Sequence, residues 1–196
     1  MTARWVVDEI RPARDLNITW QPISLLRKNE PAEDSDYYAP VLFTHKLLRV
    51  MEAVRAAEGE QAVERAYWHF ATLIHHDQNR DFDVADELEA AGLDRSYAAG
   101  FDDESLDAEI ATRMDIGIDL AGNDIGTPII AFDDAAGDKV ALFGPVITRV
   151  PDTELSLQLW DGFIACATVP GFWELKRTRT VGPDMSTVDP ATLDQR

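Results

Sequence analysis

Cysteine is almost absent from this chain of 196 residues, and Cys166 is the only one. A single cysteine excludes an internal disulfide and a metal site built from several cysteines. Basic residues are also scarce, because 18 Lys and Arg stand against 36 Asp and Glu and leave a net charge of −18. So negative a chain argues against nucleic acid or an anionic membrane as its partner.

Long apolar runs and targeting signals are missing as well. No stretch is apolar for long enough to span a bilayer, and the N-terminus does not resemble a signal peptide, so we expect a cytoplasmic protein. Repeats and low-complexity segments are absent. With 45% hydrophobic residues, the chain is long enough for one domain with a sizeable core and room for a subdomain.

The stretch from Ile125 to Pro151 carries the clearest structural pattern. Two runs rich in β-forming residues flank the turn cluster Asp133–Asp138, which predicts a β-hairpin. Pro128 opens the first strand, a position where a missing N–H is tolerated. A helix is expected to start at Pro151-Asp152. Its predicted apolar face consists of Leu155, Leu159, Phe163 and Cys166.

The rest of the chain is mainly helical in pattern, apart from one predicted strand at Leu16–Gln21 and a polar loop at 25–40. Pro12 is an awkward residue inside the first predicted helix. After residue 180 no periodicity remains, and we expect a loose tail. The predicted helices cover residues 2–14, 41–58, 60–75, 83–91, 94–99 and 102–120.

Four short blocks, in this order along the chain, resemble one known family. They are Gly126-Thr127-Pro128, Phe143-Gly144-Pro145, Leu159-Trp160-Asp161 and the run from Glu174 to Thr180. They look like the DsbA-like family, in the branch that includes the mycothiol-dependent nitroreductases, and the resemblance covers most of residues 2–180. It implies an α/β fold of the thioredoxin type. The sheet domain would comprise residues 1–24 and 122–180, the inserted all-helical subdomain 25–121, and the loose C-terminal tail 181–196.

The resemblance also points to a gap. In the relatives, a strand ends in Cys-Pro-x-Cys, or in a variant without the second cysteine, and a helix with Thr/Ser-Arg-Trp follows. Thr2-Ala3-Arg4-Trp5 matches that continuation. We therefore expect the first strand and the redox motif to lie upstream of Met1, which leaves this chain without a catalytic residue and inactive. Its exposed sheet edges would then favour a homodimer.

The function implied by the resemblance is that of a DsbA-like thiol-disulfide oxidoreductase or a mycothiol-dependent reductase. Its partner would be a small-molecule thiol or disulfide, with a mycothiol-like thiol as co-substrate and no bound cofactor. The alternative is a non-catalytic thioredoxin-like binding or scaffold protein. A third possibility is the glutathione-dependent isomerase side of the fold, where serine replaces cysteine, but no serine occupies that place here.

The resemblance assigns thiol or substrate binding to Thr127, Pro128, His75 and Asn29. It also implies a cis bond between Thr127 and Pro128, whereas the dipeptide alone favours trans. From the residues alone, His75 is equally well explained as a cation near a helix C-terminus, and Asn29 as a turn residue. Tyr37 and Tyr38 are weaker candidates for the wall of the same cleft.

Two other groups are read as structural. His75, His76 and Asp77 are consecutive, and adjacent helical side chains diverge by about 100°, so we expect no metal site there. Cys166 is expected to act as a small hydrophobic residue of the last helix. The basic run Lys176–Arg179 is interpreted as a solvated face, with capture of a carboxylate as the alternative.

Overall fold

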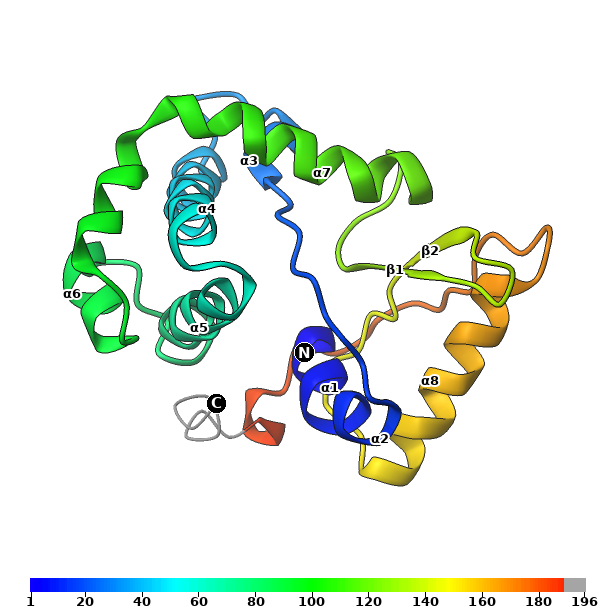
Figure 1. Ribbon diagram of the computed structural model, residues 1–196. Coiled ribbons are helices and arrows are strands. Elements are labelled where there is room, and N and C mark those ends of the chain that lie inside the picture. Colours follow the sequence, from blue (N-terminus) through cyan, green and yellow to red (C-terminus); the bar gives the residue numbers. More distant parts are fainter. Residues whose placement is uncertain (189–196) are drawn as a thin grey trace. The chain divides into compact units, whose positions relative to one another are not determined.

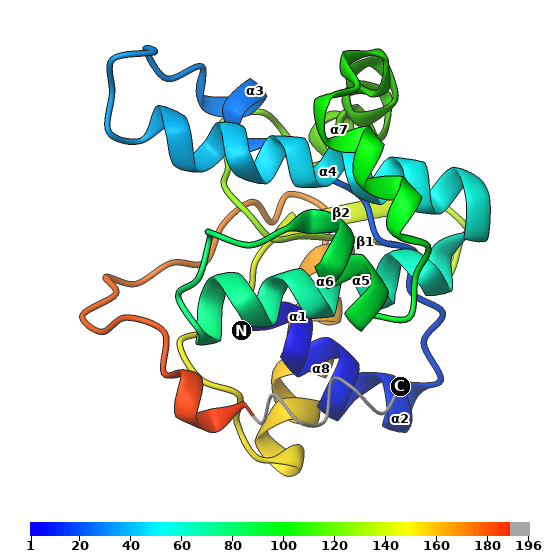
Figure 2. The same ribbon diagram turned by 90° about the vertical axis from the view of Figure 1, so that its left-hand side faces the viewer.

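The computed structural model describes residues 1–188, and these form a mostly helical α/β protein with one small sheet (Figures 1 and 2). They divide into two compact units. Among the described residues, unit 1 consists of Met1–Ile18 and residues 116–188, and unit 2 consists of Thr19–Asp115. The resemblance placed the domain limits after residues 24 and 121, whereas the two units of the structure change over after residues 18 and 115.

The first helical segment of unit 1 changes its winding to accommodate Pro12. Helix α1 (Thr2–Trp5) is followed by a π-helical turn, η1 (Val6–Ile10), and by α2 (Arg11–Arg14). The N–H of Arg11 donates to the carbonyl of Val6, five residues back. Pro12 then falls in the first turn of α2, where its missing N–H costs little. The segment ends at Asp15, which is left-handed with φ of 50°.

The predicted hairpin is confirmed. Strand β1 (Ile129–Asp133) pairs antiparallel with β2 (Lys139–Phe143), with Ile129 opposite Phe143 and Asp133 opposite Lys139. The turn between them is closed by hydrogen bonds from the N–H groups of Ala136 and Asp138 to Asp134 Oδ1. These two strands are the whole sheet of the described residues.

Helix α8 (Thr153–Thr168) follows the hairpin and is capped by Asp152, which accepts the N–H of Leu155. Its buried residues are Ser156, Trp160 and Phe163. Of the predicted apolar face, Phe163 is buried and Leu159 packs against the core, but the prediction was wrong for Leu155, which is 55% exposed. Trp160 packs on Trp5, with ring centroids 5.9 Å apart, and together with Ile10 they form the core of unit 1.

The segment after residue 180 is partly ordered. A short 3-10 turn, η5 (Met185–Thr187), is held by the N–H of Asp184 on the carbonyl of Thr148 and by the N–H of Val150 on Thr187 Oγ1. The rest of the predicted tail, residues 189–196, lies outside the described residues.

Unit 2 is all-helical. α4 and α5 are joined at Gly59 and lie side by side (Figures 1 and 2), with η3 packed on α4. The close approach of η3 requires a glycine, because a Cβ on Gly100 would lie 3.3 Å from the carbonyl oxygen of Arg49. The helices are α3 (Leu25–Asn29), α4 (Tyr38–Glu58), α5 (Glu60–Ala71), the π turn η2 (Thr72–His76), α6 (Val84–Ala90), the 3-10 turns η3 (Arg95–Asp102) and η4 (Glu104–Leu106), and α7 (Asp107–Ala121), which continues into unit 1.

The core of unit 2 is formed by the apolar faces of these helices. Its centre is an apolar stripe of α5, within the predicted helix 60–75, where Val63, Ala66 and Phe70 are each at most 2% exposed. Val50 and Val54 of α4 meet this stripe and are fully buried.

Two predictions for residues 16–40 were wrong. Leu16–Gln21 forms no strand, because no second strand lies beside it among the described residues. The predicted polar loop at 25–40 begins with helix α3, which Ser24 caps by accepting the N–H of Arg27 at 3.2 Å. Within residues 1–188, no helix combines the length and apolarity needed to cross a bilayer.

Candidate functional site

The turn that leads into β1 is the first candidate site, and Thr127 and Pro128 lie in it. The Thr127–Pro128 peptide bond is cis, as the resemblance implied. Thr127 is exposed, Pro128 is half-buried, and the carbonyl of Pro128 accepts the N–H of Gly144 at 2.8 Å. Within the described part of the chain no hydrogen bond of Thr127 is found.

The neighbouring residues of unit 1 hold this turn in place. Gly126 approaches the ring of Phe143 so closely that a Cβ would lie 3.3 Å from Phe143 Cε2. A larger residue would push the ring away from the end of β2. On the other side, the hydroxyl of Thr2 donates to the carbonyl of Pro145 at 2.7 Å, which ties the start of α1 to the loop after β2.

Asn29 and His75 belong to unit 2. Asn29 is the last residue of α3, is exposed, and donates from Nδ2 to Tyr37 Oη at 3.1 Å. The structure thus brings Asn29 together with one of the two tyrosines proposed beside it. His75 lies in η2 and is exposed, and its carbonyl accepts a hydrogen bond from Gln78 Nε2 at 2.8 Å. No hydrogen bond joins His75 to Asn29 among the residues that the structure describes.

Cys166 is a free thiol on α8 and is half-buried. It lies one turn beyond Phe163, on the flank of the buried face. In residues 1–188, no three His, Cys, Asp or Glu side chains are placed to hold a metal ion together.

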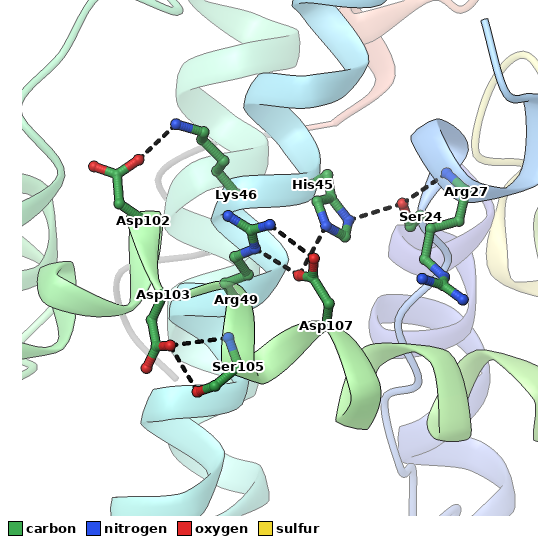
Figure 3. Close-up of polar contacts among 9 residues, drawn as sticks. All are labelled: Ser24, Arg27, His45, Lys46, Arg49, Asp102, Asp103, Ser105 and Asp107. Carbon is green, nitrogen blue, oxygen red and sulfur yellow. Dashed lines mark hydrogen bonds and ion pairs between the residues drawn. The ribbon is translucent and has the colours of Figure 1, made fainter.

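A polar chain inside unit 2 was missed by the sequence analysis (Figure 3). Ser24 Oγ lies 2.9 Å from His45 Nδ1, and His45 Nε2 lies 3.0 Å from Asp107 Oδ1. Arg49 holds the same carboxylate with two hydrogen bonds, of 2.6 and 2.8 Å. The chain links the start of α3, the middle of α4 and the start of α7.

The donors in this chain follow from the charge of Asp107. Hydrogen bonds from Arg49 hold the pKa of Asp107 below its ordinary value, so the carboxylate is ionised and accepts only. His45 Nε2 therefore carries the proton, and His45 Nδ1 accepts the hydroxyl of Ser24. Burial lowers the pKa of His45, against the opposing effect of Asp107, and favours this neutral form.

The hydrogen-bonded order Ser–His–Asp is that of an activated serine nucleophile, but a nucleophile must be accessible to its substrate and this serine is buried. Ser24 is 1% exposed and His45 2% exposed, and Ser24 Oγ also accepts the N–H of Arg27. A substrate carbonyl has no access to such a hydroxyl. We therefore interpret the polar chain as structural, because its hydrogen bonds connect the helices α3, α4 and α7. The sequence gives one local signal, the spacing of His45 and Arg49 on one face of α4. Nothing local points to Asp107, which lies 62 residues from His45.

The fold and the turn define the class of the protein. A hairpin entered through Gly-Thr-Pro, with an all-helical unit earlier in the chain, makes a mixed α/β protein compatible with a thioredoxin-like fold. Among known protein families, the model of the Rv2466c-like family, described as "Mycothiol-dependent nitroreductase Rv2466c", matches residues 1–177. The match spans most of the chain, and the protein therefore belongs to this family.

Membership confirms the nitroreductase branch of the predicted resemblance. It supports an oxidoreductase role of the mycothiol-dependent reductase type, with a small-molecule thiol as co-substrate. The wider DsbA-like relationship, the disulfide activity and the roles of Thr127, Pro128, His75 and Asn29 remain predictions.

Proposed function

We propose that this protein binds a mycothiol-like thiol for the reduction of a nitro compound or a disulfide, and that the Thr127–Pro128 turn contacts this thiol. The observation that carries the proposal is the family match over residues 1–177, which includes the turn. The turn suits the role because Thr127 is exposed and keeps its peptide groups available for hydrogen bonds to a thiol or a peptide-like ligand.

The electrons of the reaction come from the thiol. Two thiols lose two hydrogen atoms and join as a disulfide, and a nitro group that receives these atoms becomes a nitroso group and releases water. The protein contributes by binding and orienting the thiol. Cys166 is not assigned as a nucleophile, because it is half-buried on α8 and no cationic residue adjoins it in the sequence.

Binding at the turn is tested by amide NMR of the full chain during titration with mycothiol and with mycothiol disulfide. We expect saturable shifts of the Gly126 and Thr127 amides, whereas the amide of Gly137, at the opposite end of the hairpin, serves as the internal control and stays in place. Equal shifts at both ends, or none at Thr127, would remove the turn from the site.

The roles of His75 and Asn29, which the resemblance assigns in unit 2, are tested separately. His75→Ala and Asn29→Ala are expected to weaken mycothiol binding several-fold without changing the melting temperature, since both side chains are exposed. Asp77→Asn is the matched control for His75, because it alters an exposed neighbour. Unchanged binding in either alanine variant would withdraw that residue.

The second candidate function is a non-catalytic thiol-binding or scaffold protein, and it is favoured by the lack of any cysteine besides Cys166. Nitro and disulfide turnover with mycothiol separates the two candidates. Binding without turnover supports the scaffold. Turnover that survives Cys166→Ser supports a reductase driven by the bound thiol, and turnover lost in that variant would make Cys166 the nucleophile.

A further inference from the structure

Helix α5 of unit 2 ends in a turn that is one residue wider than an ordinary helix ending. The N–H of Asp77 donates to the carbonyl of Thr72, five residues back, at 3.1 Å. The N–H of Asn79 then donates to the carbonyl of Leu73, six residues back, at 2.9 Å. In the common Schellman ending the longest of these bonds spans only five residues. We call residues 72–79 the wide turn.

The sequence gives a physical reason for the extra residue. Phe70 is 2% exposed in the core of unit 2, and in a continuous α-helix the residue seven positions further on shares its face. That residue is Asp77, and a carboxylate is costly to bury without a partner. The wide turn rotates Asp77 off the buried face and leaves it exposed, while Ile74 stays buried at 7% exposure.

The wide turn closes on a residue whose conformation is unusual for its type. Gln78 is left-handed, with φ of 53°, whereas glycine or asparagine is the usual residue in this conformation at a helix end. Any other side chain adds a steric cost there. Such an outlier persists where the surrounding structure compensates for it, and it often marks a functional constraint.

The side chain of Gln78 provides that compensation. Its amide Nε2 donates to the carbonyl of His75 at 2.8 Å. The carbonyls of a last helical turn have no following turn to bond them, and here a side chain takes that place. Glycine has no such amide, and the asparagine side chain is one methylene shorter. The left-handed glutamine is therefore explained by its contact with His75.

We propose that Gln78 is a positioning residue of the thiol site, which fixes the backbone at His75 and thereby the direction of the His75 ring. A carbonyl is attached directly to its Cα, so a bond to it restrains the backbone of that residue, and the side-chain rotamer follows the backbone. The proposal rests on the proposed function, in which His75 binds the thiol, and it gives Gln78 no contact with the thiol itself. Widened helical turns are frequent at functional sites.

Two substitutions separate the amide from the backbone conformation. Gln78→Gly removes the amide but suits the left-handed conformation, so the lost bond and the relieved strain oppose each other and the melting temperature should stay near that of the wild type. Gln78→Glu keeps the size of the side chain, but near neutral pH its carboxylate has no proton to donate to a carbonyl. Gln61→Glu, at an exposed residue of the opposite end of α5, is the matched control for the added charge.

The position of the ring is measured by the side-chain signals of His75 in ¹H–¹³C NMR spectra of the full chain. The chain has four histidines, and His75→Ala identifies the signals that belong to His75. Both Gln78 variants should shift these signals, whereas those of His45 and His69, whose rings are hydrogen-bonded to carboxylates, should stay in place. Gln61→Glu should shift none of them. Unshifted His75 signals in both Gln78 variants would overturn the proposal.

Titration with mycothiol measures whether this position matters for binding. Each Gln78 variant is expected to raise the Kd about three- to tenfold, the range for one misaligned hydrogen bond. In the His75→Ala background, Gln78→Gly should have no further effect, because the two residues act as one unit. A further loss in that background would show that Gln78 acts without His75, and would overturn the proposal.

The same measurements separate this proposal from the proposed function. If His75→Ala weakens binding but the Gln78 variants bind mycothiol like the wild type, positioning by Gln78 is wrong and the role of His75 stands. If His75→Ala itself binds like the wild type, the thiol-binding role of His75 is wrong. Shifted His75 signals in the Gln78 variants would then still support the positioning of the ring.

Discussion

Replacement of Asp107 by asparagine tests the buried polar chain of unit 2 most directly. The change keeps the shape of the side chain and removes its charge. One oxygen remains to accept hydrogen bonds from His45 Nε2 and Arg49 Nε, but the NH2 group that replaces the other oxygen meets Arg49 Nη2, which is also a donor. The Arg49 side chain is only 7% exposed, so its cation would lose its ionised partner in a place that water hardly reaches.

The size of the effect follows from this burial. Removal of one partner from a fully buried ion pair costs about 3–5 kcal/mol. Asp107 keeps 31% of its side chain exposed, so water replaces part of the lost interaction. We therefore expect Asp107→Asn to lower the free energy of unfolding by about 2–3 kcal/mol, in line with hydrogen bonds to charged groups at about 1.5–3 kcal/mol each.

Asp102→Asn is the matched control. Asp102 pairs with Lys46 of the same helix α4, but its side chain is 78% exposed. Exposed pairs contribute about 0–1 kcal/mol, so urea unfolding followed by circular dichroism should separate the two variants clearly. Equal losses of unfolding free energy in the two variants, or a loss below about 1 kcal/mol for Asp107→Asn, would refute a structural role for the polar chain of Ser24, His45 and Asp107.

The pH dependence gives a second test of Asp107. Because the folded-state pKa of Asp107 is lowered, its stabilising effect is present above the unfolded value of about 3.9 and is lost as the pH falls through the folded pKa. The difference between wild type and Asp107→Asn should therefore shrink in acid, where both side chains are neutral. A difference that stays constant down to the acid transition would show that its origin is not the charge.

Two further predictions concern the interior of each unit. Since burial lowers the pKa of His45, the unfolded chain binds the proton more readily, and wild-type stability should fall as the pH drops below about 6.5. The urea midpoint of His45→Gln should lack this part of the pH dependence. If the midpoints of wild type and variant fall in parallel with pH, His45 is not the group that titrates. Trp5→Ala, at a side chain that is 0% exposed, should cost about 3–5 kcal/mol, whereas Trp173→Ala, at one that is 86% exposed, should stay within about 0.5 kcal/mol in the same urea assay. Similar losses in both tryptophan variants would argue against the core of unit 1.

The sequence predicts elements whose signal is local. The hairpin was found because Asp134 and Gly137 supply turn chemistry between two β-forming runs, and all of this lies within 15 neighbouring residues, 129–143. The helix over residues 60–75 was found because its apolar residues recur every three or four positions and so share one face. For the same reason Leu16–Gln21 was mistaken for a strand, since alternation describes a strand only when a second strand is there to pair with it.

The residues of the candidate sites differ in the same respect, namely whether the signal that reveals them is local in the sequence. Thr127 and Pro128 were found through short blocks that resemble a family, and the cis bond came from that resemblance alone, because the dipeptide favours trans. The contact of Ser24 with His45 spans 21 residues and that of His45 with Asp107 spans 62, distances over which one sequence carries no pairing signal. Asp107 by itself is one of many acidic residues in an acidic chain.

The missed polar chain bears on the site through helix α3. Ser24 caps α3 at its first turn, and Asn29, the proposed thiol-binding residue of unit 2, ends the same helix after five residues. A helix this short has little stability of its own, so its position depends on its attachments. The attachment at its start is the hydroxyl of Ser24, and His45 and Asp107 determine where that hydroxyl lies. The position of the exposed Asn29 amide thus depends on the Asp107 carboxylate of the same unit, and a carboxylate that touches no ligand can still affect how a thiol is bound.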